Sequence, residues 1–110
     1  MILFLSKKAT SEQAEGMLEA LEIYVKLAVD VEKRTLAGGG TLHADCEAVL
    51  LENGSLQENI WGADWVPHSR QVTFESLINI RPVQNNFSLE VQDEELRNTI
   101  EEIVREILDE

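Results

Sequence analysis

Residues 23 to 32 alternate between apolar and polar side chains with a period of two. The core-facing set is Ile23, Val25, Leu27, Val29 and Val31, and the alternate set is Tyr24, Lys26, Ala28, Asp30 and Glu32. Successive side chains of a β-strand point to opposite faces of a sheet, so the pattern predicts a strand with one buried and one exposed face. Such a strand requires strand partners and a layer of helices over its apolar face.

Further strands are predicted on both sides of this one. Residues 2–5 form an uninterrupted apolar run, which is typical of a short core strand. Residues 33 and 34 are placed to form the tip of a hairpin that returns through residues 35–37, and the glycine run 38–40 predicts a tight turn. Residues 60–66 alternate again until Pro67 ends the pattern.

Residues 72–81 predict the last strand. Its core-facing set is Val72, Phe74, Ile78 and Ile80, and its outward set is Glu75, Asn79 and Arg81. Pro82 is expected to end this strand, because proline has no amide hydrogen to donate to a neighbouring strand.

Two segments have clear helical patterns. Thr10 and Gln13 have the spacing of a capping box, and the apolar residues after them recur at helical spacing: Ala14, Met17, Leu18 and Leu21. Asp93 is the predicted N-cap of a C-terminal helix. The apolar face of that helix is Leu96, Ile100, Ile103, Val104, Ile107 and Leu108.

Residues 42–53 fit two structures. The first half of this segment alternates as a strand would, yet four apolar residues also fall at helical spacing: Leu42, Cys46, Val49 and Leu50. Gly54 suits the end of a helix, but Asn53 and Gly54 together are equally a hairpin-turn signal. The helix is favoured, because residues 49–51 break the alternation that a strand needs.

These elements predict an α+β fold in which residues 1–110 form a single globular domain. The sheet is expected to be mixed but mostly antiparallel, with four to five strands, and the helices are expected to pack on one face. The order along the chain is β-α-β-β-α-β-β-α. The other face of the sheet is expected to expose Asp30, Glu32, Asn79 and Arg81.

The charge balance excludes two classes of partner. The chain has 21 acidic and 9 basic residues, a formal net charge of −12. This surface repels phosphate backbones and anionic headgroups, so nucleic acid and membranes are not expected partners, whereas a basic protein would be attracted. The single cysteine, Cys46, cannot form an intramolecular disulfide. Together with the lack of a signal peptide or a membrane-length apolar run, this predicts a cytoplasmic protein.

Several strings of this chain resemble a family of small bacterial proteins of unknown function. They are residues 29–33 (VDVEK), 39–45 (GGTLHAD), 50–55 (LLENGS), 61–62 (WG) and 78–82 (INIRP), and the likeness runs from about Val25 to the end of the final helix. Arg34 departs from the family pattern, which has glycine there. The loop 83–88 departs as well, because the pattern has serine, glycine and arginines, so a basic loop for an anionic ligand would be partly lost. The resemblance implies no activity.

His43, Asp45 and Glu47 are the most concentrated chemistry-bearing residues of the chain. A histidine beside carboxylates can transfer protons, so these three are candidate catalytic residues. His43 and Glu47, completed by Asp30 or Glu32, are also candidate ligands for a divalent metal such as zinc, manganese or iron. Helix capping by His43 and Asp45, with a solvated Glu47, is commoner, so the cofactor is unknown and a metal is not favoured.

The outward set Asp30, Glu32, Asn79 and Arg81 forms a candidate ligand-binding surface. The planar guanidinium of Arg81 is suited to hold a carboxylate or a phosphate. A half-exposed strand carries alternating polar residues in any case, and Arg81 pairing with its own acids is the commoner outcome.

Trp61 and Trp65 share one face of a predicted strand and are candidate interface residues, for a protein partner or for a homo-oligomer. Core packing is the commoner role of such a pair. Cys46 lies between two acids, which oppose formation of a thiolate, so it is expected to be a small buried side chain.

Two classes of function remain. The first is a non-enzymatic binding or protein-interaction module. The alternative is a small metal-assisted hydrolase or related enzyme centred on His43, Asp45 and Glu47. The module is favoured, because no pair of nucleophile and base and no spaced metal motif stands out in the sequence.

Overall fold

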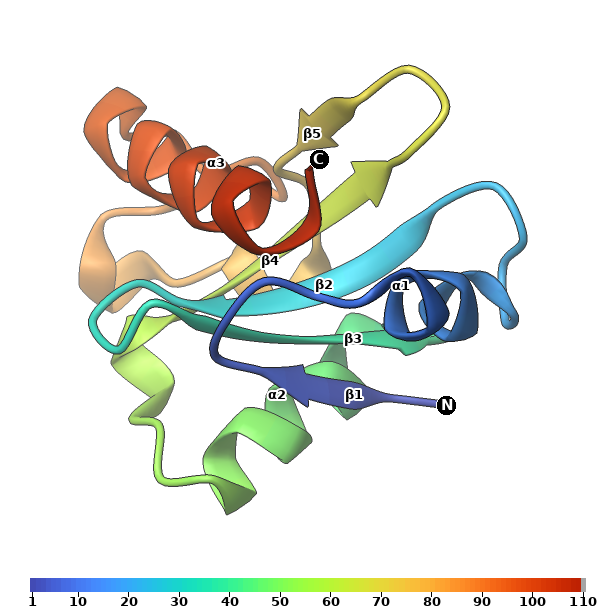
Figure 1. The fold of residues 1–110 in the computed structure, drawn as a ribbon. Helices are drawn as coiled ribbons and strands as arrows, with labels where there is room; N and C mark the ends of the chain where they lie inside the picture. The colour runs from blue at the N-terminus through green and yellow to red at the C-terminus, as the bar shows by residue number, and fades with distance from the viewer. Residues whose placement is uncertain (110) are drawn as a thin grey trace.

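The computed structural model describes residues 1–109, in which one antiparallel sheet has five strands in the order β1-β3-β2-β4-β5 (Figure 1). The strands are β1 (Leu3–Leu5), β2 (Val25–Asp30), β3 (Thr35–Gly40), β4 (Ile60–Val66) and β5 (Gln71–Thr73). The helices are α1 (Ser11–Leu18), α2 (His43–Glu52) and α3 (Glu94–Leu108). The predicted α+β class and the predicted order of elements are confirmed.

Strand β2 lies at the centre of the sheet and pairs with β3 and β4. It begins at Val25, so Ile23 falls outside the strand and is exposed. Arg34 ends the turn between β2 and β3 with a φ of 57°. Glycine adopts this left-handed conformation without steric cost, which explains why a glycine at this position is the expected pattern.

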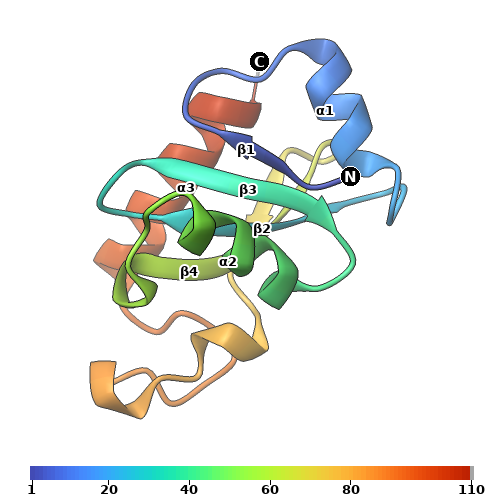
Figure 2. The ribbon, with the colours of Figure 1, turned by 90° about the horizontal axis from the view of Figure 1, so that it is seen from below.

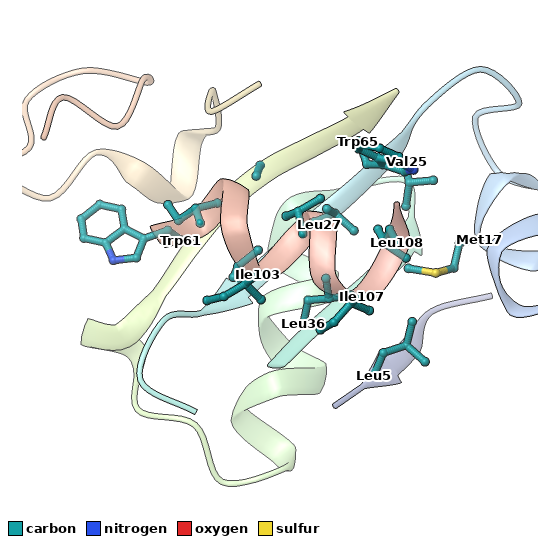
Figure 3. Close-up of a cluster of buried hydrophobic side chains, with 14 of the residues drawn as sticks. Leu5, Met17, Val25, Leu27, Leu36, Trp61, Trp65, Ile103, Ile107 and Leu108 are labelled. Atoms are coloured by element: carbon teal, nitrogen blue, oxygen red, sulfur yellow. The ribbon is translucent and has the colours of Figure 1, made fainter. Parts of the chain in front are cut away.

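Helices cover both faces of the sheet (Figures 1 and 2). Helix α3 and Met17 of α1 belong to a cluster with side chains of one face: Leu27, Val29, Leu36, Ala63, Trp61 and Trp65 (Figure 3). Helix α2 packs through Cys46 and Leu50 on the other face, against Ala28, Ala37 and Ile60. The prediction of helices on one face only is therefore wrong. The second face carries small side chains, which weaken its apolar signal in the sequence but let α2 approach closely.

The glycine run is part of β3 and not the tight turn that the sequence predicted. A Cβ atom on Gly38 would lie 2.5 Å from Leu27 Cδ2 and 2.7 Å from Met17 Cε. Gly39 has a φ of 105°, and a Cβ atom there would collide with the backbone carbonyl oxygen of Met1. These glycines therefore let α1 and the N-terminal segment lie directly against the strand.

The predicted strand over residues 72–81 is correct only in its first part, because β5 ends at Thr73. The chain then forms two short 3₁₀ helices, at Leu77–Asn79 and Pro82–Gln84. Ile80 is exposed, whereas Asn79 is completely buried, which is the reverse of the predicted pattern. Side-chain hydrogen bonds, chiefly those of Asn79, replace the backbone pairing of a strand in this segment.

The predicted helices are confirmed, and so are the N-caps predicted for α1 and α3. Thr10 Oγ1 accepts a hydrogen bond from the Gln13 amide at 3.1 Å, and Gln13 Oε1 accepts one from the Thr10 amide at 2.9 Å. Asp93 caps α3 by accepting from the Glu95 amide at 3.0 Å. Residues 43–52 are helical, as favoured. In the described part of the chain, none of these helices has the length and apolar character needed to cross a membrane.

We predict that the substitution Gly39→Ala lowers the free energy of unfolding by about 2 kcal/mol or more, because it combines a strained φ with a backbone collision. Gly16→Ala is the matched control. Nothing lies within 4 Å of a Cβ atom at Gly16 in α1, so this change should stabilise the protein by about 0.5 kcal/mol. Urea denaturation of both variants measures the difference, and equal effects at the two sites would contradict the close packing of Gly39.

Candidate functional site

His43 lies in the first turn of α2, and its side chain reaches across to residues of β4. Its Nε2 atom is 2.8 Å from Asp64 Oδ1 and 3.1 Å from the Ala63 carbonyl oxygen. Both partners accept hydrogen bonds, so we assign the proton to Nε2. Asp64 also accepts from the Thr73 hydroxyl at 3.4 Å. The carboxylate that orients His43 is therefore Asp64, which sequence spacing did not indicate because it lies 21 residues away.

Glu47 lies one turn after His43 but points to a different partner. Its Oε2 atom is 3.7 Å from Arg81 Nη2, and both side chains are largely buried. Asp45 is exposed. Among residues 1–109, no three histidine, cysteine, aspartate or glutamate side chains are grouped as metal ligands. The structure thus does not bring His43, Asp45 and Glu47 together around one point. Nor do His43 and Asp45 cap α2. The N-cap residue of this helix is Leu42, and there is no side-chain hydrogen bond at the cap.

Asp30 is completely buried rather than exposed on an open sheet face. Its Oδ1 atom accepts hydrogen bonds from the amides of Glu32 and Lys33, each at 2.9 Å. Its Oδ2 atom accepts from the Ser55 hydroxyl at 2.5 Å. Asp30 therefore holds the β2–β3 turn against the loop that follows α2, while the Glu32 side chain is exposed. The expectation that Asp30 and Arg81 face solvent is wrong, because α2 and the segment after β5 cover this face.

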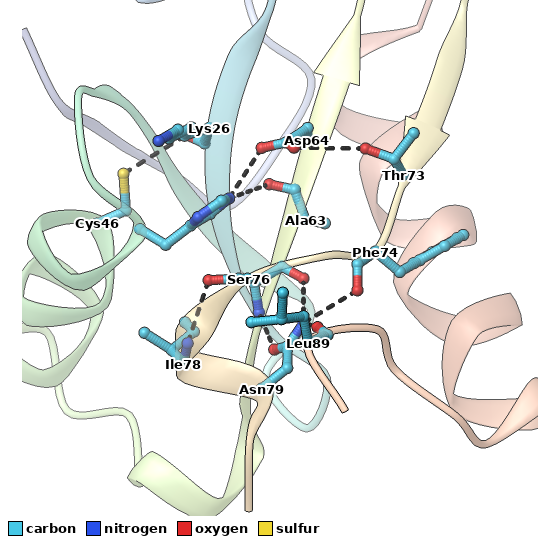
Figure 4. A network of polar contacts seen from close by, with 12 residues as sticks. Lys26, Cys46, Ala63, Asp64, Thr73, Phe74, Ser76, Ile78, Asn79 and Leu89 are labelled. Atoms are coloured by element: carbon cyan, nitrogen blue, oxygen red, sulfur yellow. Dashed lines mark hydrogen bonds and ion pairs between the residues drawn. The ribbon is translucent and has the colours of Figure 1, made fainter. Parts of the chain in front are cut away.

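Asn79 uses its side-chain amide to join the segment after β5 to the sheet (Figure 4). Its Oδ1 atom accepts from the Gly62 amide at 2.8 Å. Its Nδ2 atom donates to the carbonyl oxygens of Gly62, Phe74 and Leu89 at 3.0, 3.1 and 3.2 Å. A Cβ atom on Gly62 would lie 2.5 Å from Ser76 Cβ, so only glycine allows this close contact. Asn79 is thus a structural residue, and it exposes no atom to a ligand.

Asn86 is a second buried amide with the same role. Its Nδ2 atom donates to the carbonyl oxygens of Asn79, Ser88 and Glu90 at 2.7, 3.0 and 3.0 Å. Its Oδ1 atom accepts from the Gln92 amide at 2.8 Å. In the sequence, Asn86 is one residue of the loop 83–88. The only local signal was an asparagine pair in a loop, which does not distinguish a buried amide from a solvated one.

Arg81 is inserted between β4 and the loops beside it. Its guanidinium carbon lies 4.5 Å from the centroid of the Trp61 ring. The guanidinium and Nε groups donate to backbone carbonyl oxygens of Gln57, Ile60 and Ile78. Burial lowers the pKa of Arg81, and the nearby Glu47 carboxylate opposes that shift. Most N–H donors of Arg81 already bind groups inside the protein. Arg81 therefore holds the loops in place and does not offer its guanidinium group to a ligand in solvent.

These three side chains hold an irregular segment whose apolar residues point outward. We call these residues the 77–89 patch: Leu77, Ile80, Val83, Phe87 and Leu89. Val83 is 98% exposed, Leu77 78% and Phe87 66%. The segment forms a separate projection below the sheet in Figure 2. In the sequence, Ile80 fitted the strand alternation predicted over residues 72–81, and only the structure shows that these apolar residues lie outside the core.

Trp61 and Trp65, the candidate interface residues, are both buried in the core that β4 forms with α3. Cys46 is also buried, and its Sγ atom lies 3.5 Å from the Lys26 carbonyl oxygen. Burial raises the pKa of the Cys46 thiol, and the neighbouring Asp45 acts in the same direction. The cysteine is therefore a buried packing residue on the side of α2 that faces the sheet, as expected.

Comparison with known proteins bears on the whole fold rather than on one residue. Residues 3–107 match the model of the family described as protein of unknown function (DUF5674). The chain belongs to this family. Neither the curated proteins nor the solved structures searched contain a match. The resemblance read from the sequence strings is thus confirmed as an uncharacterised family, and it extends further toward the N-terminus than those strings did.

For this DUF5674 member we predict that Asn79→Ala lowers the free energy of unfolding by about 3 kcal/mol or more. The substitution leaves the buried Gly62 amide without its partner and removes the hydrogen bonds that Nδ2 donates to the carbonyl oxygens of Gly62, Phe74 and Leu89. Asn98→Ala, on the exposed side of α3, is the control and should change stability by no more than about 0.5 kcal/mol. Thermal and urea unfolding measure both, and a small effect of Asn79→Ala would show that the segment after β5 is not anchored by this amide.

We also predict that Cys46 reacts with Ellman's reagent at least about 100-fold more slowly in the native protein than in denaturant, at mildly alkaline pH. The thiolate is the reactive form, and burial both raises the thiol pKa and excludes the reagent. The initial rate of thiol release measures this. Similar rates in the two states would show that α2 separates readily from the sheet.

Proposed function

We propose that this chain is a non-enzymatic interaction module that binds a basic partner protein through the 77–89 patch. The observation that carries this proposal is the exposure of large apolar side chains on a segment that buried amides hold rigidly. Isolated exposed apolar residues are common on soluble proteins, but a group of them on one anchored segment is typical of a binding surface.

The rigidity of the segment supports binding rather than incidental exposure. Asn79, Asn86 and Arg81 together make many hydrogen bonds to backbone groups around it. A partner would therefore meet a preformed surface and would lose little entropy in ordering it. Loops held in this way on a stable scaffold frequently carry recognition residues.

Charge around the patch supports a basic partner. Glu75 and Glu90 lie directly opposite each other on an antiparallel bridge, and both are exposed. Glu58 is also exposed, and its carbonyl oxygen accepts a hydrogen bond from the side chain of Gln84, which lies within residues 77–89. Two like charges opposite each other are unfavourable, and Arg97, 3.9 Å from Glu90, offsets part of this repulsion. Lysine or arginine side chains of a partner would offset more of it.

The same charges argue against a second copy of this chain as the occupant. Each copy has a net charge of −12, so self-association would oppose two acidic surfaces. A cytoplasmic location is part of the proposal, because the lone cysteine is buried and makes no disulfide.

The proposal predicts selective binding of a helical peptide with a leucine stripe flanked by lysines. The same peptide with glutamates in place of the lysines should not bind. Amide shifts in a ¹H–¹⁵N NMR titration should concentrate in residues 75–90, and affinity should fall with added salt. The Val83→Ser/Phe87→Ser double variant should weaken binding about tenfold without lowering the melting temperature, because both side chains are exposed.

Ile23→Ser is the matched control, since Ile23 is equally exposed but lies outside the patch. Light scattering of the free protein should show a monomer. Shifts that map elsewhere, or a dimer that the double variant dissociates, would contradict a basic partner at this surface.

A further inference from the structure

A recess of about 370 Å³ lies between α1, the turn after β4 and the end of α3. Its floor contains Met17, Val25, Trp65 and Leu108, each at most 8% exposed. Helix α1 contributes two small side chains, Ser11 and Ala14, together with Glu15 and Leu18. The recess is therefore apolar at its base and open at its mouth, and its size lies in the range of small-molecule sites. Helix α1 and the C-terminal end of α3, which line the recess, lie on the other side of the molecule from the segment 77–89 (Figure 1).

At the mouth of the recess, the carboxylate of Asp109 accepts two hydrogen bonds from Arg70. Arg70 donates from Nε to Asp109 Oδ1 at 2.9 Å and from Nη2 to Asp109 Oδ2 at 3.0 Å. Arg105 Nη1 donates to the same Oδ2 atom at 3.0 Å, and Lys8 donates to the Asp109 carbonyl oxygen. These hydrogen bonds, that of Arg70 foremost, lower the pKa of Asp109. The bidentate arrangement is the one by which arginine recognises carboxylates in general.

The distribution of charge makes this mouth unusual for the chain. Only nine basic residues are present against 21 acidic ones, and three of the nine, Lys8, Arg70 and Arg105, converge on Asp109. An organic anion is repelled by most of the surface, so it would be drawn to this place more than to others. The apolar floor directly below would accept the uncharged body of such an anion.

We propose that the recess binds a small organic acid, with a compact aromatic or short alkyl body on the floor and its carboxylate on Arg70. Asp109 then acts as an internal competitor that occupies the arginine when no ligand is present. The ligand carboxylate replaces Asp109 on Arg70, and Arg105 keeps Asp109 nearby. This site is independent of the proposed protein-binding patch.

Phenylacetate is the probe, and phenethyl alcohol and phenethylammonium are controls that keep the ring and change the charge. Phenylacetate should shift the Trp65 indole N–H signal in a ¹H–¹⁵N NMR titration and raise the melting temperature by mass action. The two controls should bind at least about fivefold more weakly, because they lack the carboxylate.

Variants separate recognition from mere filling of the recess. Arg70→Gln should weaken phenylacetate binding about fivefold or more, whereas Arg97→Gln, outside the recess, should leave it unchanged. Ala14→Leu should fill the space above the floor and abolish binding. Asp109→Asn should strengthen binding about threefold, because removing the competitor raises the fraction of protein that is ready to bind.

The Asp109→Asn result decides the matter, since a purely structural aspartate would give unchanged or weaker binding when neutralised. Equal affinity for the acid and the alcohol, or the absence of any shift at Trp65, would equally overturn the proposal. Melting curves of each variant without ligand establish that it is folded. The lysine peptide should bind the Arg70→Gln, Ala14→Leu and Asp109→Asn variants normally, so failure of one proposal leaves the other standing.

Discussion

The buried amide of Asn79 is the interaction on which the shape of the 77–89 patch depends. It fills all of its hydrogen-bonding capacity with the backbone of β4 and of the segment after β5. A polar group buried without partners is costly, so this arrangement tolerates little displacement. The 77–89 patch keeps its shape because Asn79, Asn86 and Arg81 leave the chain no alternative pairing. Apolar side chains that would otherwise fold inward are thereby held in solvent.

Charge and apolar surface are divided between the two ends of α3. At its N-terminal end, exposed apolar side chains stand among carboxylates such as Glu75 and Glu90, which suits a basic protein. At its C-terminal end, Arg70, Arg105 and Lys8 surround the mouth of an apolar recess, which suits a small acid. An acidic chain can attract an anion only where its few cations are concentrated. Two of the α2 residues that suggested an enzyme, His43 and Glu47, are instead paired separately with Asp64 and Arg81, and the third, Asp45, is exposed.

The elements that the sequence predicted well are those whose signals are local. The capping box of α1, the N-cap and apolar face of α3 and the central strand each depend on neighbours within a few residues, and each is confirmed. The exposed face predicted for that strand is not, because Asp30 is completely buried. The strand predicted through Ile80 fails because Asn79, polar and therefore assigned outward, finds buried partners on Gly62 and Leu89. The candidate site fails to converge for a related reason. His43 and Glu47 share a helix face, yet their nearest opposite partners come from β4 and from the loop after β5, at sequence separations that spacing does not reveal.

The sequence alone determined three properties of this protein: the order of strands and helices, the α+β class and the acidic character. Each of them follows from short-range periodicity or from composition. Tertiary structure alone decided that helices cover both faces of the sheet, that the glycines continue a strand, and that Leu77, Val83 and Phe87 lie outside the core. The physical reason is that burial depends on which distant backbone groups satisfy a polar side chain. An asparagine or aspartate goes inward when those partners exist, and the apolar residues beside it are then turned out to solvent.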